Sequence, residues 1–94
     1  MPFDWDKNKD RINQRKHGLS FETAACVFED PAAISYKDRV VDGEQRRHTI
    51  GVAGGIMIVL AVPVVKHKNV EEEMRIISAR KADRRERALY ESHR

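Results

Sequence analysis

The chain has 94 residues, a formal net charge of +3 and 40% hydrophobic residues, so we expect a single domain over residues 1–94. A single cysteine, Cys26, excludes an internal disulfide framework, and its apolar neighbours suggest that it is buried. The longest apolar run, residues 56–65, is too short to cross a bilayer as a helix, and the charged first residues are not typical of a signal peptide. We therefore expect a cytoplasmic protein that does not associate with membranes.

The first third of the chain predicts two helices. Asp6 suits an N-cap, so the first helix should cover Lys7–His17, and Gly18 suits the left-handed residue that follows a helix. Ser20 suits the N-cap of a second helix over residues 21–29.

The period of the apolar residues then changes from that of helices to that of strands. The expected strands cover residues 32–37, 46–53, 56–65 and 71–79. A loop is predicted over residues 38–45, and Gly54-Gly55 is typical of a two-residue hairpin turn. The third strand is apolar on both faces, which indicates a central strand, and we expect it to end or bulge near Pro63 because proline cannot donate to the ladder.

A capping box of Asp83 and Glu86 predicts a last helix, Arg84–Ser92. The predicted fold class is therefore α+β, with two N-terminal helices packed on an antiparallel sheet of about four strands and a C-terminal helix after it.

The positive charge is concentrated at the end of the chain. Residues 75–94 carry seven Lys or Arg against three Asp or Glu, whereas residues 1–74 carry eleven against twelve. Such a basic segment indicates an anionic partner, of which nucleic acid is the commonest. Charge alone leaves open the simpler interpretation of a solvated terminal helix.

Five cations surround the start of the last helix, where the helix dipole disfavours positive charge. They are Arg80, Lys81, Arg84, Arg85 and Arg87. A helix start is also an anion site, because its N–H groups are free, and added arginines can bind phosphate with two hydrogen bonds. The alternative is that these cations pair with acidic neighbours on a solvated surface, which we favour only for Arg87.

Strand alternation extends the predicted anion site onto the sheet. If the apolar faces of the strands meet the two N-terminal helices, Arg47 and Arg75 project from the open face. The floor of that face would consist of small residues: Thr49, Gly51 and Ala79. His48 would then lie on the apolar face, and we assign it no role.

The sequence contains none of the common metal or cofactor motifs. HExxH, paired Cys-x-x-Cys, the phosphate-binding loop and the dinucleotide fingerprint are all missing, and the spacing of His17 and His67 is not that of metal ligands. We therefore expect neither a metal nor a cofactor.

Four stretches of the chain resemble the BrnT toxins of bacterial type II toxin–antitoxin systems. They are FDWDKNK, NQRKHGLSFETAACVFEDP, RRHTIG and RIISARKADRRERALYE. The resemblance implies a RelE-like ribonuclease fold and a toxin that inhibits translation by cleaving RNA. It also implies an antitoxin, BrnA, which carries a DNA-binding ribbon-helix-helix element and forms a hetero-oligomer with the toxin.

The chemistry that fits this resemblance is metal-independent endonucleolytic cleavage, in which a ribose 2′-OH attacks the adjacent phosphate. Four residues are predicted to be catalytic by holding and neutralising the phosphodiester: Arg47, Arg75, Arg80 and Arg84. Four more are predicted to contact RNA: Arg85, Lys81, Lys16 and His17. No general base stands out, and Lys9, Lys16 and His17 all remain open for that role. The alternative function is a non-catalytic nucleic-acid or protein binding module of the same fold.

Overall fold

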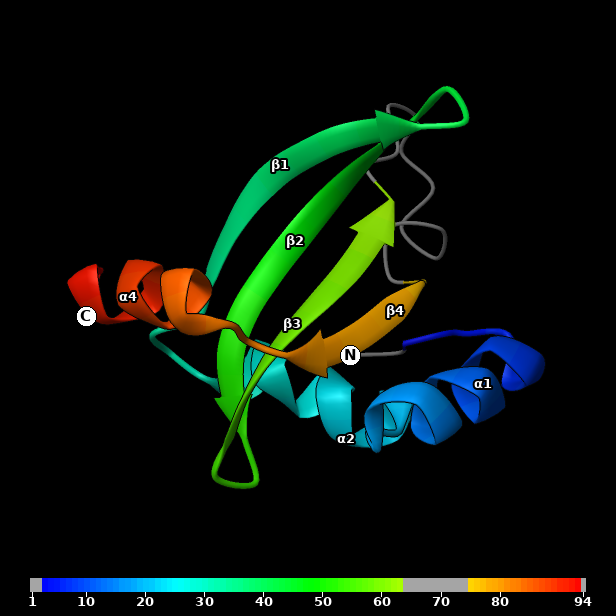
Figure 1. The fold of residues 1–94 in the computed structure, drawn as a ribbon, viewed down its shortest axis with the longest axis horizontal. Coiled ribbons are helices and arrows are strands. Elements are labelled where there is room, and N and C mark those ends of the chain that lie inside the picture. Colours follow the sequence, from blue (N-terminus) through cyan, green and yellow to red (C-terminus); the bar gives the residue numbers. More distant parts are fainter. Residues whose placement is uncertain (1–2, 64–74, 94) are drawn as a thin grey trace.

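The computed structural model describes residues 3–63 and 75–93, in which helices pack on a four-stranded antiparallel sheet of order β1-β2-β3-β4 (Figure 1). The elements are α1 (Lys7–His17), α2 (Phe21–Ala25), the 3-10 helix η1 (Cys26–Glu29), β1 (Ile34–Val41), β2 (Glu44–Ala53), β3 (Ile56–Pro63), β4 (Ser78–Lys81) and α4 (Arg84–Ser92). The predicted α+β class is confirmed. No helix in this part of the chain is both long and apolar enough to cross a membrane.

Helix α1 begins and ends where its capping residues predict. The Asp6 carboxylate accepts hydrogen bonds from the backbone N–H groups of Asn8 and Lys9, at 2.7 and 3.1 Å. At the other end Gly18 has a φ of +69°, and its N–H donates to the carbonyl of Gln14. A left-handed residue of this kind is most easily supplied by glycine, which has no Cβ.

The second predicted helix is present, but its second half winds as the 3-10 helix η1. Ser20 caps its start by accepting a hydrogen bond from the N–H of Thr23. The residues that turn inward are Phe21, Ala24 and Val27. This spacing leaves Cys26 on the outer side, so the prediction that Cys26 is buried is wrong.

The loop predicted over residues 38–45 is also wrong. Strand β1 continues to Val41 and β2 begins at Glu44, so that only Asp42 and Gly43 connect them. Both residues have positive φ, +51° and +77°. Two-residue turns with positive φ match the twist of the strands that they join, which allows both strands to run up to the turn.

A β-bulge interrupts the β1–β2 pairing. The register shifts by one residue between Lys37 and Val40. Asp38 and the residue after it therefore lie opposite Arg46 alone.

The centre of the sheet agrees with prediction. Gly54-Gly55 forms the β2–β3 turn with φ of +58° and +79°, and β3 lies between β2 and β4. Its last described residue is Pro63; residues 64–65, the end of the predicted strand, lie outside the described residues.

The last strand lies later in the chain than predicted. Residues 71–74 are outside the described residues, and Arg75 forms only an isolated parallel bridge with Asp4. Ile76 and Ile77 lie outside the ladder, and regular pairing with β3 covers Ser78–Lys81.

The two faces of the sheet carry different helices. One face packs against the end of α1, α2 and η1 through a core of Leu19, Phe21, Ala24, Val27, Ala53, Ile58, Leu60, Val62, Ile76 and Ala79. The other face packs against the segment that leads into α4, and against α4 itself, through Ile50, Val59, Ala82 and Tyr90. Alternate residues of β3 thus serve opposite cores, which explains why that strand is apolar throughout.

The predicted assignment of the faces is wrong. Thr49, Gly51 and Ala79 are buried beneath the N-terminal helices and do not form an open floor. A Cβ on Gly51 would come within 2.6 Å of Cγ1 of Val27 and 3.2 Å of its carbonyl oxygen. The small residues therefore allow η1 to approach the sheet closely.

Asn13 of α1 covers the outer edge of β4. Its Oδ1 accepts a hydrogen bond from the N–H of Ala79 at 3.2 Å, and its Nδ2 donates to the carbonyl of Ala79 at 2.8 Å. The same Nδ2 donates to the carbonyl of Leu19 at 3.0 Å. The buried amide thus satisfies edge groups that would otherwise lack a partner.

We expect Asn13→Asp to destabilise the fold by about 1–3 kcal/mol, because the carboxylate cannot donate to the two carbonyls and would be buried beside them. Thermal or urea unfolding measures this change. Asn8→Asp is the matched control, since it adds the same charge to an exposed position of the same helix. Equal stability of the two variants would show that the Asn13 hydrogen bonds contribute nothing.

Candidate functional site

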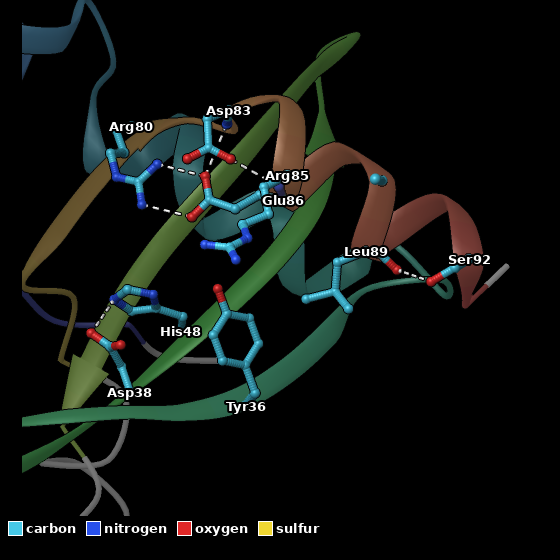
Figure 2. A pocket seen from close by; sticks show the side chains of 10 residues that line it. Tyr36, Asp38, His48, Arg80, Asp83, Arg85, Glu86, Leu89 and Ser92 are labelled. Carbon is cyan, nitrogen blue, oxygen red and sulfur yellow. Dashed lines mark hydrogen bonds and ion pairs between the residues drawn. The ribbon is translucent and has the colours of Figure 1, made fainter.

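An open pocket of about 760 Å³ lies between the edge of the sheet and α4 (Figure 2). Its lining residues come from β1, β2, β4 and the start and outer side of α4: Tyr36, Asp38, His48, Arg80, Asp83, Arg85, Glu86, Ala88, Leu89 and Ser92. The volume is in the range of pockets that bind small ligands or single groups of larger ones.

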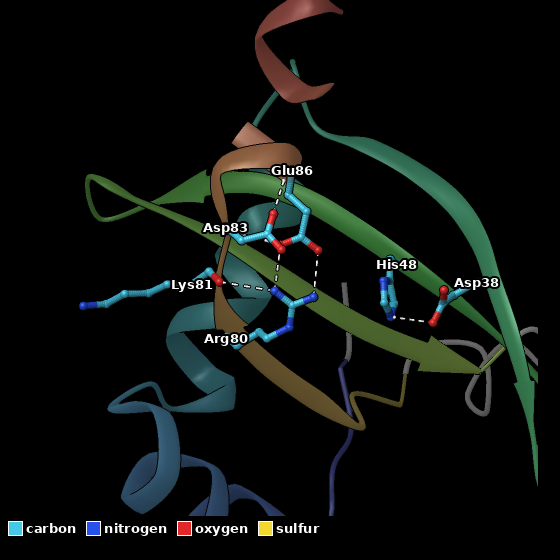
Figure 3. A network of polar contacts seen from close by, with 6 residues as sticks. All are labelled: Asp38, His48, Arg80, Lys81, Asp83 and Glu86. Atoms are coloured by element: carbon cyan, nitrogen blue, oxygen red, sulfur yellow. Dashed lines mark hydrogen bonds and ion pairs between the residues drawn. The ribbon is translucent and has the colours of Figure 1, made fainter. Parts of the chain in front are cut away.

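An ion pair closes the end of the pocket where β4 passes into α4 (Figure 3). Both terminal nitrogens of Arg80 donate to the Glu86 carboxylate at 2.7 Å. Glu86 also accepts a hydrogen bond from the N–H of Asp83 at 2.9 Å, and Asp83 caps the helix by accepting from the N–H of Glu86 at 2.8 Å. Strand and helix are therefore joined through one carboxylate.

The ion pair changes the acidity of both partners. Hydrogen bonds from Arg80 lower the pKa of Glu86, and the same carboxylate raises the pKa of Arg80. The Glu86 side chain is only 11% exposed, whereas the Arg80 side chain is 38% exposed. The guanidinium therefore still faces the pocket and the solvent, although Glu86 binds both of its terminal nitrogens.

A second group of polar side chains stands on the β1–β2 hairpin. Tyr36 and His48 are direct cross-strand partners, and their rings meet edge to face with centroids 5.6 Å apart. Nε2 of His48 lies 3.2 Å from Oδ2 of Asp38, which is the first residue of the β-bulge. Figure 2 shows these three side chains beneath Arg80 and Arg85.

Tyr36 stays protonated at neutral pH. Burial raises the pKa of its hydroxyl, and the negative charges of Glu86 and Asp38 raise it further. The phenol is therefore a hydrogen-bond donor in the pocket.

The structure brings together only part of the predicted site. Arg80 and Arg85 line the pocket. Arg84 and Lys81 are exposed nearby, outside its lining. Both belong to the same strand–helix joint as the ion pair.

The other predicted residues lie elsewhere. Arg75 pairs with Asp4 at 3.5 Å, and both side chains are well exposed. Arg47 lies on the opposite face of β2 from His48, because adjacent strand residues alternate. Lys16 and His17 line a smaller pocket of about 200 Å³ beside α1, together with residues 77 and 78. The predicted convergence of four arginines on one open face is therefore not observed.

Sequence reasoning missed Tyr36, Asp38 and His48. The Asp42-Gly43 turn could have indicated a hairpin, but extending the pairing regularly from that turn would place Tyr36 opposite Thr49. The bulge at Asp38 shifts the register and brings Tyr36 opposite His48.

Within residues 3–63 and 75–93, no three His, Cys, Asp or Glu side chains are grouped so that they could hold a metal ion.

The low pKa of Glu86 predicts a pH-dependent contribution to stability. A carboxylate whose pKa is lowered by folding stabilises the fold above its ordinary pKa of 4.5, and this contribution is lost as the pH falls below 4.5. We expect Glu86→Gln to lose about 1–2 kcal/mol at pH 7, since Arg80 is partly solvated. The difference in the free energy of unfolding between wild type and Glu86→Gln, measured with urea, should shrink as the pH is lowered from 4.5 to 3.

The control for this experiment is Glu29→Gln, because Glu29 is exposed and forms no ion pair with the described residues. A deficit of Glu86→Gln that stays constant across this pH range would contradict the ionic origin of the stabilisation.

Comparison with known proteins assigns the chain to a family. The sequence profile of the ribonuclease toxin BrnT of type II toxin–antitoxin systems matches residues 5–86. A search of individually curated proteins finds no match. The matched region includes the two N-terminal helices, the whole hairpin and the Arg80–Glu86 ion pair, so the chain belongs to the BrnT family of ribonuclease toxins.

Proposed function

We propose that the pocket between the β1–β2 hairpin and α4 cleaves RNA endonucleolytically and without a metal ion. In this reaction the ribose 2′-OH attacks the adjacent phosphate and the 5′-oxygen leaves. The observation that carries the proposal is that one pocket contains two guanidinium groups, a neutral phenol and an imidazole (Figure 2). These are the groups that bind a phosphodiester and move its protons.

Arg85 is the phosphate ligand in this proposal. Its side chain forms no hydrogen bond or ion pair with any residue of the described part of the chain, so its donors are available to a substrate. Arg80 supplies a second guanidinium group, which Glu86 holds in place and whose charge Glu86 balances. A preorganised donor of this kind needs no rearrangement when charge develops on the phosphate.

The carboxylates of the pocket do not oppose anion binding as strongly as their number suggests. The lining contains three of them against two guanidinium groups. Asp38 contacts His48, Asp83 caps α4, and Glu86 binds Arg80. Each carboxylate is thus engaged by a donor of the protein.

In this proposal the remaining predicted residues contact the RNA away from the scissile phosphate. Arg84 and Lys81 flank the pocket and would contact neighbouring phosphates, which contributes affinity without sequence preference. Arg47, Arg75, Lys16 and His17 lie away from the pocket, and a role for them requires RNA that extends around the sheet edge or the end of α1.

A toxin of a type II system has an antitoxin as its partner. We propose that this partner is of the BrnA type, with a ribbon-helix-helix element, and that it forms a hetero-oligomer in the cytoplasm. It would cover the pocket and the first turn of α4. Acidic side chains of the antitoxin would contact Arg84 and Arg85, and Leu89 of the pocket, which is 38% exposed, would offer an apolar contact. Release from the complex would let the toxin cleave RNA and stop translation.

We expect purified protein to cleave an RNA oligonucleotide in EDTA and to leave a 2′,3′-cyclic phosphate and a 5′-hydroxyl. Arg85→Ala should lower the rate roughly ten- to a hundredfold, because one charge-assisted contact in the transition state is worth about 1.5–3 kcal/mol. Arg87→Ala is the control, since Arg87 is exposed on the same helix and does not line the pocket. Activity that requires added magnesium would contradict the proposed chemistry, and equal losses in the two variants would contradict a positioned phosphate ligand.

We expect the toxin to co-purify with a co-expressed antitoxin, and RNA to compete with that antitoxin. The association rate should fall as salt is raised, because opposite charges steer the encounter. Amide exchange on the complex should show protection at residues 80–88. Protection confined to α1, with RNA still bound to the complex, would exclude direct coverage of the pocket.

A further inference from the structure

We infer that His48, oriented by Asp38, removes the proton from the attacking ribose 2′-OH, and that Tyr36 donates a proton to the leaving 5′-oxygen. This inference rests on the proposed function, since it assigns the proton transfers of the same reaction. It adds a base and an acid, and the sequence contained no clear candidate for the base.

The hairpin places the two groups together. Tyr36 and His48 are cross-strand partners, so both side chains project from the same face of the sheet into the pocket. Their ring centroids are 5.6 Å apart, a spacing that brings both within reach of one phosphodiester. Arg85 stands above them in the same pocket (Figure 2).

Asp38 determines which nitrogen of His48 can act as the base. Nε2 lies 3.2 Å from Oδ2 of Asp38, and in the neutral ring it donates its hydrogen to that carboxylate. Nδ1 then carries the free lone pair. No described residue forms a hydrogen bond with Nδ1, so it can accept a proton from the substrate. The carboxylate would also stabilise the imidazolium that results.

The surroundings of His48 include charges of both signs. On its own face of the sheet stand Tyr36 and Asp38 of β1 and, two residues away in β2, Arg46. Its partner in β3, Ala61, carries no charge. The charged groups that face the pocket from β4 and α4 are Arg80, Asp83, Arg85 and Glu86. Arg80 and Glu86 pair with each other, and the charged group that contacts the His48 ring itself is Asp38.

Tyr36 is suited to the acid role because its hydroxyl keeps its proton at neutral pH. Burial and the nearby carboxylates both favour the neutral phenol. The candidates for the base that the sequence left open are less suitable, because Lys9, Lys16 and His17 line the smaller pocket of about 200 Å³ beside α1.

The proton transfers balance. The 2′-oxygen forms a bond to phosphorus as its proton passes to Nδ1 of His48. The bond from phosphorus to the 5′-oxygen breaks as that oxygen takes the proton of the Tyr36 hydroxyl. The products are a 2′,3′-cyclic phosphate and a 5′-hydroxyl, and water returns the proton from His48 to Tyr36 before the next turnover.

The test is single-turnover cleavage of an RNA oligonucleotide from pH 5 to pH 9. Wild type should slow at acidic pH, because a general base must be unprotonated to accept the proton of the 2′-OH. His48→Gln should lose about a hundredfold or more in rate and should lose this acidic limb, with RNA binding nearly unchanged. His93→Gln, in the residue that follows α4, is the matched control and should behave as wild type.

A modified substrate separates the acid from the base. When the leaving 5′-oxygen is replaced by sulfur, departure no longer needs a proton donor. Tyr36→Phe should therefore be slow on normal RNA and restored on the 5′-thio substrate, whereas His48→Gln should be slow on both. Asp38→Asn should be slower than wild type and should have a shifted acidic limb.

Different results would contradict the inference and the proposed function. An unchanged rate and pH profile in His48→Gln, or no restoration of Tyr36→Phe, would overturn the inference while leaving RNA cleavage by the pocket intact. Wild type that cleaves no RNA in EDTA would overturn the proposed function itself. Circular dichroism checks the fold of every variant. If His48→Gln does not fold, the thio test on Tyr36→Phe and the profile of Asp38→Asn still decide the matter.

Discussion

The candidate site depends on the carboxylate of Glu86. This one group binds both terminal nitrogens of Arg80 and also accepts the N–H of Asp83. It therefore fixes the direction in which α4 leaves β4. A second contact holds α4 near its other end, where the Tyr90 hydroxyl donates to Asp30 at 2.6 Å. The same oxygen of Asp30 accepts the N–H of Val52, which ties this end of the helix to β2. These contacts help to position α4, and Arg85 with it, over the hairpin.

The ion pair accounts for one of the cations at the start of α4. A cluster of arginines at a helix N-terminus is unfavourable when every charge is free. Here Glu86 neutralises Arg80 within the first turn, and the capping box satisfies helix N–H groups at the same time. Arg84 and Arg87 point into solvent, which screens them. Of the two arginines that line the pocket, Arg85 is the one that has no ion-pair partner among the described residues.

The two faces of the sheet have different roles: one forms the main core with the N-terminal helices, and the other carries the candidate site. The face beneath α1, α2 and η1 is covered, and its small residues allow close contact of helix and sheet. The other face is covered by Tyr90 and its neighbours only in part, which leaves Tyr36, Asp38 and His48 at the edge facing the pocket. Substitutions in the pocket should therefore disturb the main core little, with Glu86 as the exception because it serves both functions.

The sequence by itself determined the features that depend on neighbours along the chain. The caps at Asp6, Ser20 and Asp83 and the turn at Gly54-Gly55 follow from local hydrogen bonds and from the freedom of glycine at positive φ, so they could be predicted. The central position of β3 followed from its apolar residues on both faces. The basic segment, residues 75–94, contains Arg80 and Arg85, which line the pocket.

Only the tertiary structure decided which face of the sheet meets which helices and which polar residues share the pocket. Small residues such as Gly51 fit either an open floor or a close helix contact, and no local rule distinguishes the two. The bulge at Asp38 shifts the register by one residue, and since side chains alternate, a shift of one exchanges the residues that face each other across the strands. Register depends on contacts between strands, and these contacts exist only once the sheet has formed.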